Sequence, residues 1–199
     1  MMSKDGLLHR RAVVAELLRD RSDLLVIAGL GAPNWDVSAA GDHPNNFPLW
    51  GAMGSAAMIG LGLALAQPQR RVLVITGDGE MLMALGALAT IAAQKPANLT
   101  VCVLDNERFG ETGMQKTHTA YGIDLAGIAK AAGFPKSLLV REAQQVTELR
   151  ECAHNGTGPT FAQVKIDPEA LPFVLPPAEG GILKNRFRAS VLGEEALYN

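Results

Sequence analysis

Short runs of wholly apolar residues alternate along this chain with longer segments of helical periodicity. Within each run the side chains that point to either face of a strand are apolar. Each run therefore predicts a strand that is buried on both faces. Such strands are typical of a parallel sheet that helices cover on both sides. The sequence therefore predicts an α/β fold, a three-layer sandwich with a parallel sheet in the middle. The predicted strands cover residues 24–28, 72–76, 99–104, 138–140 and 161–166.

The segments between these runs predict helices. The segment 80–94 is apolar nearly all round and is expected to be largely buried. Residues 29–46 contain Gly29, Gly31 and Pro33 and are expected to form a loop after the first strand. The expected helices cover residues 7–18, 52–66, 80–94, 125–132, 143–154 and 183–197.

A length of 199 residues favours one domain over two. We expect a single domain over residues 1–199, with a core at about 20–167 and a C-terminal extension at 168–199 that begins Pro-rich. With 48% hydrophobic residues the chain is not disordered, and a net charge of −2 argues against a nucleic-acid partner. No apolar stretch is long enough to span a bilayer and no signal peptide is recognisable, so we expect no membrane partner and a cytoplasmic protein. Cys102 and Cys152 form no disulfide framework or metal-ligand spacing, and Cys102 is expected in the core.

Two polar motifs follow neighbouring predicted strands. Gly77, Asp78 and Gly79 stand where the second strand passes into a helix, and Asp105 and Asn106 follow the third strand after 25 intervening residues. A free helix start favours an anion such as phosphate, and Mg²⁺ commonly joins one or two carboxylates to phosphate oxygens. By itself the first motif is also compatible with a tight turn in which Asp78 caps the helix. Together, the two motifs predict a shared ion at the carboxyl edge of the sheet.

The pattern GDG, 25 residues, then DN resembles the signature of thiamine diphosphate enzymes, in their diphosphate-binding domain. The segments NFPLWGAMGSAAMIGLGLALAQPQRRVLVITGDG and LDNERFGETGMQKTHT resemble the sulfopyruvate and phosphonopyruvate decarboxylase branch of that superfamily. The resemblance spans roughly residues 24–166 and implies thiamine diphosphate and Mg²⁺ as cofactors. Asp105 stands where an asparagine is more usual; this position is not the family's metal ligand, and a turn role is expected.

Through this resemblance, metal and diphosphate contacts are assigned to five residues. The side chains of Asp78 and Asn106 and the backbone carbonyl of Arg108 are expected to bind Mg²⁺. The backbone N–H groups of Gly79 and Glu80 are expected to hold the diphosphate.

The resemblance also implies a contact region for the rest of the cofactor in the segment GAMG. The carbonyl of Gly51 is expected to accept a hydrogen bond from the 4'-amino group of the cofactor. Met53 is expected to act in catalysis by holding the cofactor in a bent shape, the alternative being simple core packing. Further cofactor contacts are expected from Ala52, Gly77, Phe109, Gly110, Glu111 and Thr112.

The segment 111–119 is the expected substrate side of the site. The resemblance implies contacts from Thr112, Gln115 and Thr117. His118 is a candidate proton donor, because imidazole titrates near neutral pH, or else a solvent-exposed loop histidine. Lys116 either pairs with an acidic group of the substrate or is solvated.

Two other segments near the strand ends carry weaker signals. His43 either faces the site or belongs to a turn. The start Gly29-Leu30-Gly31 resembles a dinucleotide fingerprint, but Asn34 stands in place of the third glycine and Pro33 is expected to break the helix start.

Enzymes of this kind also need a glutamate beside the aminopyrimidine ring of the cofactor, and the resemblance implies that it lies on a different domain. None of the four candidate glutamates lies in the family's context for that residue: Glu16, Glu80, Glu107 and Glu111. We therefore expect a separate α-type chain that carries the pyrimidine-binding domain and its glutamate, in an α2β2 or larger hetero-oligomer. The expected function is that of a β-type subunit of a decarboxylase that converts a short 2-oxo acid to CO₂ and an aldehyde.

Three alternatives remain open from the sequence. A carboligase subunit similar to acetohydroxyacid synthase would also carry GAMG and would give a 2-hydroxy-ketone instead of an aldehyde. A non-catalytic subunit that only binds thiamine diphosphate is disfavoured by the intact Asp78 and Asn106. A 2-oxoacid:ferredoxin oxidoreductase β chain is disfavoured because two isolated cysteines cannot hold a four-cysteine iron–sulfur cluster.

Overall fold

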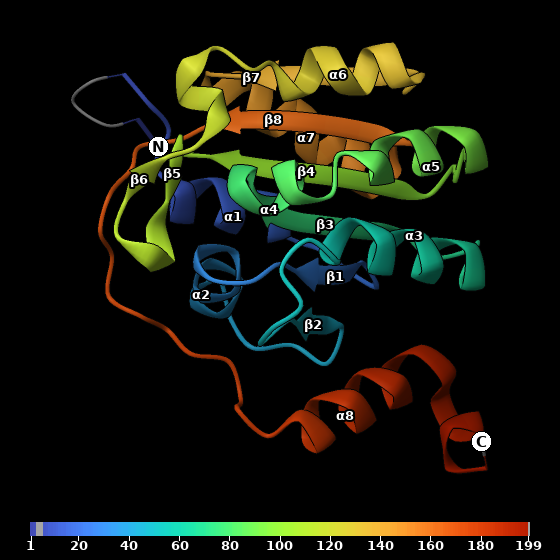
Figure 1. The fold of residues 1–199 in the computed structure, drawn as a ribbon. Helices are drawn as coiled ribbons and strands as arrows, with labels where there is room; N and C mark the ends of the chain where they lie inside the picture. The colour runs from blue at the N-terminus through green and yellow to red at the C-terminus, as the bar shows by residue number, and fades with distance from the viewer. Residues whose placement is uncertain (3–5, 199) are drawn as a thin grey trace.

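A computed structural model describes residues 1–2 and 6–198 of the chain. Six strands form one sheet in the order β2-β1-β3-β4-β8-β7, and every neighbouring pair is parallel (Figure 1). All five predicted strands are present, so the parallel α/β sandwich is confirmed. The strands are β1 (Leu25–Ala28), β2 (Asn46–Pro48), β3 (Val72–Gly77), β4 (Leu99–Asp105), β7 (Lys136–Val140) and β8 (Thr160–Lys165).

Helices cover both faces of this sheet (Figure 1). One face carries α1 (Arg10–Leu18), α2 (Ala32–Ala39) and α7 (Ala143–Asn155). The other carries α3 (Ala56–Ala66), α4 (Asp78–Met83), α5 (Gly86–Gln94) and α6 (Leu125–Ala132). Successive residues of the central strands point into the two cores in turn, as the pleat of a strand requires.

Strand β4 shows how both cores share the sheet. Val101 and Val103 pack into the core under α3, α5 and α6, whereas Cys102 and Leu104 pack into the core under α1 and α7. Each such side chain contributes about 1.5–3 kcal/mol through burial. Cys102 is a core residue as predicted, and burial raises the pKa of its thiol to about 12.

The segment after β3 differs from the single buried helix predicted there. It begins at Asp78 and breaks at Ala84 and Leu85 into α4 and α5. Met83 is 63% exposed, because a helix in an outer layer buries only the side that faces the sheet. The expectation of a largely buried helix over 80–94 was therefore wrong.

Two further elements differ from the sequence prediction. Residues 29–46 are not all loop: α2 forms there, and Pro33 lies in its first turn, where the missing N–H removes no intrahelical hydrogen bond. The prediction that Pro33 breaks the helix start was wrong. The helix predicted at 52–66 begins only at Ala56, because Ala52 (φ 57°) and Gly54 (φ 96°) hold the preceding segment in a turn.

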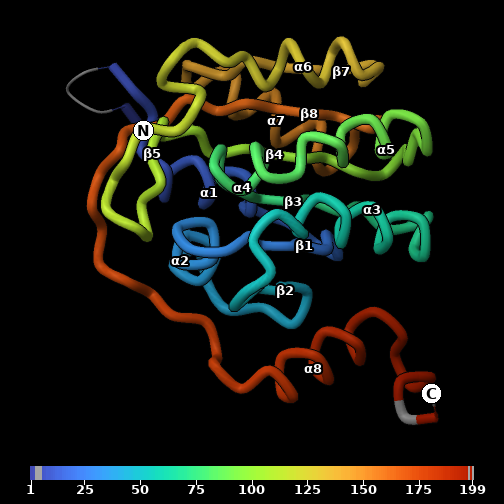
Figure 2. The backbone as a smooth tube through the Cα atoms, viewed as in Figure 1, coloured from blue at the N-terminus to red at the C-terminus, as the bar shows by residue number. Residues whose placement is uncertain are grey.

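The ends of the chain pack onto this sandwich. Leu8, Val13 and Leu17 are fully buried, so the core begins ahead of the predicted boundary at about residue 20. The C-terminal extension runs from the carboxyl edge of the sheet past α2 and then forms α8 (Gly180–Leu192) beside β2 (Figure 2). Phe187 of α8 lies 5.0 Å from Phe47 of β2 between ring centroids. No helix among the described residues is long and apolar enough to cross a membrane.

Candidate active site

A cavity of about 360 Å³ opens at the carboxyl edge of the sheet. It lies where β1, β3 and β4 end and where the hairpin of β5 (Arg108–Phe109) and β6 (Gln115–Lys116) leaves the sheet (Figure 1). Most of the residues that the sequence assigned to cofactor and metal surround this one cavity. They are Met53, Gly77, Asp78, Gly79, Glu80, Asn106, Arg108, Phe109, Gly110, Glu111 and Thr112.

Asp78 lines the cavity, and one of its two carboxylate oxygens, Oδ2, is hydrogen-bonded within the chain. It is 2% exposed, and its Oδ2 accepts a hydrogen bond from the hydroxyl of Thr117. The hydroxyl of Thr119 lies 3.1 Å from the same oxygen. Burial raises the pKa of Asp78 to about 6, the nearby charge of Asp105 adds to the rise, and the two threonine hydroxyls oppose it. No side chain among the described residues bonds the other oxygen, Oδ1, and the carboxylate also accepts a hydrogen bond from its own backbone N–H.

Asp105 is the centre of a second buried network behind Asp78. Its Oδ2 accepts hydrogen bonds from Gln163 Nε2 at 2.6 Å and from Lys165 Nζ at 2.9 Å. Its Oδ1 lies 2.8 Å from the Thr119 hydroxyl and 3.0 Å from the backbone nitrogen of Glu107. The hydrogen bond from the backbone of Glu107 fits the predicted turn role of Asp105. The buried ion pair between Asp105 and Lys165 is a second role that the sequence did not predict. Asp105 and Asp78 are two buried carboxylates that lie near each other, and the charge of Lys165 compensates that of Asp105.

Asn106 and Arg108 follow β4 and line the same cavity as Asp78. The backbone N–H of Arg108 donates to Asn106 Oδ1 at 2.9 Å, which fixes the direction of the amide group. An amide oxygen has two lone pairs, so Oδ1 keeps one for a cation. One carboxylate, one amide oxygen and one backbone carbonyl are hard oxygen donors that suit Mg²⁺ when phosphate supplies the remaining ligands. The residues present therefore fit the predicted metal.

The turn that carries Met53 is tied to the residues after β3 by the side chain of Glu80. Glu80 is buried; its Oε1 accepts from the backbone N–H of Gly54 at 3.1 Å and its Oε2 from the Thr76 hydroxyl at 2.6 Å. A Cβ atom on Gly29 would lie 2.0 Å from Glu80 Oε2, so only glycine leaves room for this carboxylate. The sequence pattern assigned Glu80 a role through its backbone and gave no sign of this contact.

Gly79, Phe109 and Met53 form one contact at the mouth of the cavity. A Cβ atom on Gly79 would lie 2.6 Å from Cε1 of Phe109 and 3.7 Å from Cε of Met53. Met53 is 38% exposed and lines the cavity, so simple core packing does not explain it. Gly51 and Ala52, in the same turn, are exposed and lie outside the cavity lining.

The predicted substrate residues are brought together only in part. Thr112 lines the cavity, whereas Gln115 is exposed and its side chain bonds Thr112. Thr117 is fully buried with its hydroxyl on Asp78, which turns it away from any substrate. His118 and Lys116 are exposed and are not among the residues that line the cavity.

His43 lies in a turn away from the cavity lining. Its Nδ1 accepts a hydrogen bond from the backbone N–H of Asn45 at 3.1 Å, which supports the turn interpretation. Burial and the positive charge of Arg21 lower its pKa.

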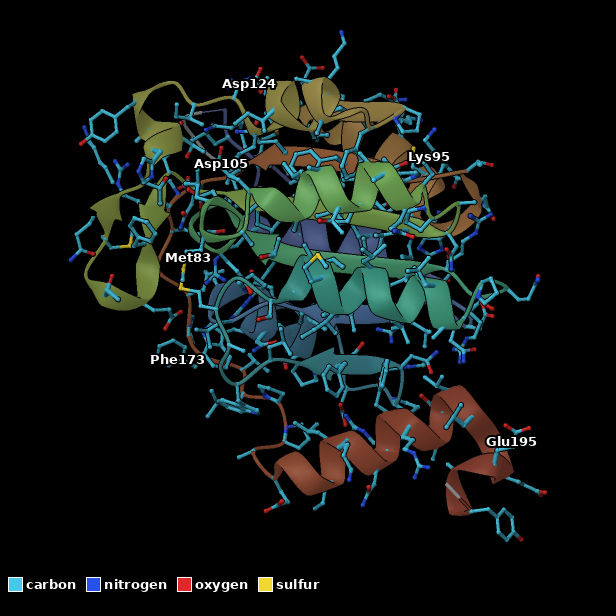
Figure 3. All side chains as sticks on the ribbon, turned by 45° about the vertical axis from the view of Figure 1, so that its right-hand side comes forward. Met83, Lys95, Asp105, Asp124, Phe173 and Glu195 are labelled. Atoms are coloured by element: carbon cyan, nitrogen blue, oxygen red, sulfur yellow. The ribbon has the colours of Figure 1, made fainter. Side chains whose placement is uncertain are left out.

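The site contains residues that the sequence did not single out. Thr119, Gln163 and Lys165 hold the two aspartates, and Trp35 Nε1 donates to Glu111 Oε1 at 3.3 Å, which links the hairpin to α2. Gln163 and Lys165 stand within an otherwise apolar predicted strand, and these polar interruptions were the available signal. Figure 3 shows Asp105 and Met83 at this edge of the molecule, away from Lys95 at the other end.

Comparisons with known proteins identify the family of the chain. A sequence model described as thiamine pyrophosphate enzyme, C-terminal TPP binding domain, matches residues 35–164. The sulfopyruvate decarboxylase subunit beta of Methanothermobacter thermautotrophicus is 41% identical over 81% of this chain and 84% of its own length. The phosphonopyruvate decarboxylase of Streptomyces viridochromogenes is 37% identical over 90% of this chain, which spans only 44% of that protein. The benzoylformate decarboxylase structure from Polynucleobacter necessarius has a TM-score of 0.66 at 21% identity, over 83% of this chain and 34% of that one.

Proposed function

The chain belongs to the thiamine pyrophosphate enzyme family, and from that premise we propose that it is the β-type subunit of a decarboxylase dependent on thiamine diphosphate and Mg²⁺. Its substrate is a short 2-oxo acid, which it converts to CO₂ and an aldehyde. The observation that carries the proposal is the single cavity that Asp78, Asn106 and Met53 share. The names of the relatives, which are decarboxylases of sulfopyruvate and phosphonopyruvate, favour a 2-oxo acid with a second acidic group.

We assign the cofactor contacts to the residues around the cavity. Asp78, Asn106 and the carbonyl of Arg108 bind Mg²⁺, and the backbone N–H groups of Gly79 and Glu80 hold the diphosphate. Gly51 accepts from the aminopyrimidine and Met53 supports the cofactor from below. When bound, the cofactor supplies the stabilisation of negative charge that loss of CO₂ requires.

The protein's own part is to hold these groups still and to keep their charges matched. Thr117 and Thr119 hold one oxygen of the Asp78 carboxylate in place at the cavity. Lys165 compensates Asp105, so that Asp78 is the carboxylate left to meet a cation. The ring of Phe109 lies against Gly79 at the cavity, where there is no room for a side chain at position 79.

We further propose that residues 1–199 form one diphosphate-binding domain, with 168–199 as its extension, and that a partner α-type chain completes the active site. Met53 and Met83 are exposed at the cavity, which supports a partner surface above them. The four candidate glutamates already have partners in this chain, which supports a glutamate supplied from outside. Glu16 pairs with Arg19, Glu80 with Gly54 and Thr76, Glu107 with Lys165, and Glu111 with Trp35.

Turnover assays with and without a partner test this function. The chain is expressed alone and together with a candidate α-type chain, and a panel of 2-oxo acids is supplied with Mg²⁺ and thiamine diphosphate. We expect CO₂ and an aldehyde from the pair and none from the chain alone. A 2-hydroxy-ketone as the main product would indicate a carboligase instead, and turnover by the chain alone would refute the two-chain active site.

A further inference from the structure

Arg10 is a buried charged residue in the wall of the cavity, and the site described above gives it no role. It is 5% exposed, is the first residue of α1, and lines the cavity. The lining of the cavity also includes the apolar residues Leu30, Ala32, Pro33, Leu104 and Ile166. An ionised side chain in such a wall is costly unless its charge meets a partner.

Arg10 shares its carboxylate partner with a second arginine. Arg10 Nη1 donates to Asp36 Oδ2 at 2.7 Å, and Arg11 Nε donates to Asp36 Oδ1 at 3.2 Å. Asp36 is fully buried between them, so one carboxylate serves two guanidinium groups. The carboxylate of Glu169 also lies at the start of α1, where it accepts from the backbone N–H of Arg10 at 3.3 Å.

The guanidinium of Arg10 also has donors to spare. Only Nη1 has a hydrogen-bond partner, Asp36 and the carbonyl of Ala32, among the described residues. Nε and Nη2 have none, and neither is among the fully buried nitrogens without a partner. Arg11 differs, because its Nη2 donates to the carbonyl of Pro172 and its side chain is not part of the cavity lining.

Arg10 and Met53 approach the cavity from opposite faces of the sheet. Leu8 pairs with Ile166 just beyond β8, which holds the start of α1 at the carboxyl edge. Helix α1 packs on the face that α7 covers, whereas Met53 precedes α3 on the other face (Figure 1). Both residues line the same cavity, so a ligand that fills the cavity can contact both of them.

We propose that Arg10 binds the terminal phosphate of the cofactor through Nε and Nη2. Guanidinium groups suit phosphate because they donate two parallel hydrogen bonds. The inference rests on the proposed function, since it takes thiamine diphosphate as the ligand. The competing ligand for the same guanidinium is the acidic group of the substrate, and the two make different predictions.

Isothermal titration calorimetry on the full chain tests the proposal. Thiamine diphosphate and inorganic diphosphate are titrated, each with Mg²⁺, into the wild type, Arg10→Met and the matched control Arg11→Met. Arg10→Met is expected to weaken both diphosphates at least tenfold, the scale of a lost charge-assisted hydrogen bond. Arg11→Met, which removes a guanidinium from the same carboxylate, is expected to weaken them less than threefold.

Each contrary result has a distinct meaning. A wild type that binds neither diphosphate, either alone or together with the α-type chain, contradicts the proposed function itself and this inference with it. A wild type that binds, with Arg10→Met equal to it or Arg11→Met equally weakened, contradicts only the role of Arg10. An unchanged cofactor affinity with a raised KM for the 2-oxo acid in the reconstituted enzyme would overturn the proposal in favour of a substrate contact.

Circular dichroism shows whether Arg10→Met folds. If it does not fold, a second variant, Arg10→Lys, tests the same contact. Arg10→Lys keeps the positive charge beside Asp36 but cannot donate the two parallel hydrogen bonds. We expect it to fold and to bind inorganic diphosphate at least threefold more weakly than the wild type. Undiminished binding by Arg10→Lys would refute the proposed contact.

Discussion

Replacing Glu80 with alanine tests whether a single buried carboxylate holds two parts of the site together. The carboxylate accepts hydrogen bonds from the Gly54 backbone and the Thr76 hydroxyl, at 3.1 and 2.6 Å. Glu80→Ala leaves both donors without an acceptor, and each buried donor left unpaired costs about 1–3 kcal/mol. We expect the free energy of unfolding to fall by about 2–4 kcal/mol, since water reaches the Gly54 side of the gap and recovers part of the loss.

The assay is urea denaturation of the full chain at 25 °C, followed by tryptophan fluorescence. Glu80→Gln serves as the conservative variant, because its amide oxygen still accepts from Gly54 and its amide nitrogen can donate to Thr76. We expect its free energy of unfolding to fall by about half as much as that of Glu80→Ala. Glu16→Ala is the matched control, since it removes only a pair with the exposed Arg19 and should cost under about 0.5 kcal/mol. A loss below about 1 kcal/mol in Glu80→Ala, or a Glu80→Gln variant as unstable as Glu80→Ala, would show that the carboxylate does not hold the two segments together.

Three further perturbations address the surroundings of the site. Gly79→Ala forces a Cβ to within 2.6 Å of Phe109 and should destabilise the chain by about 1–3 kcal/mol, measured by thermal unfolding; an unchanged Tm would contradict the contact. Lys165→Met leaves Asp105 buried without its counter-charge and should cost about 3–5 kcal/mol in urea denaturation, a loss that Asp105→Asn in the same chain should partly restore. The raised pKa of Asp78, about 6, means that the folded state holds a proton between about pH 4 and 6 that the unfolded state releases, so this group's contribution to stability falls as pH rises through that window. Stability measured from pH 4.5 to 7 should therefore fall more in the wild type than in Asp78→Asn, and equal slopes would contradict the shift.

Local signals in the sequence predicted some elements to the residue. Helix α6 spans 125–132 as expected, because Asp124 caps its start by accepting from the backbone N–H of Gly127 at 2.8 Å and Gly133 ends it at φ 108°. Strand β2 was missed because Asn46–Pro48 is short and lacks β-branched residues. Its pairing with β1 creates the strand, and that pairing is not visible locally.

The site divides in the same way between local and distant contributions. The glycine–aspartate and aspartate–asparagine motifs, their common edge, the family and the decarboxylase branch were all predicted from residues that lie close together in the sequence. The supports of Asp78 and Asp105 were not, because Thr117, Gln163 and Lys165 reach them across 39, 58 and 60 residues. Such contacts depend on the order of the strands in the sheet. The roles of Met53 and His118 in catalysis stay predictions.

The most direct test of the central claim is the binding of thiamine diphosphate to the full chain by calorimetry, with and without Mg²⁺, in the wild type and in Asp78→Ala. We expect the wild type to bind in a way that depends on Mg²⁺, and Asp78→Ala to bind at least tenfold more weakly, because the proposed metal site then has no carboxylate ligand. Binding that is equally tight without Mg²⁺, or undiminished in Asp78→Ala, would contradict it.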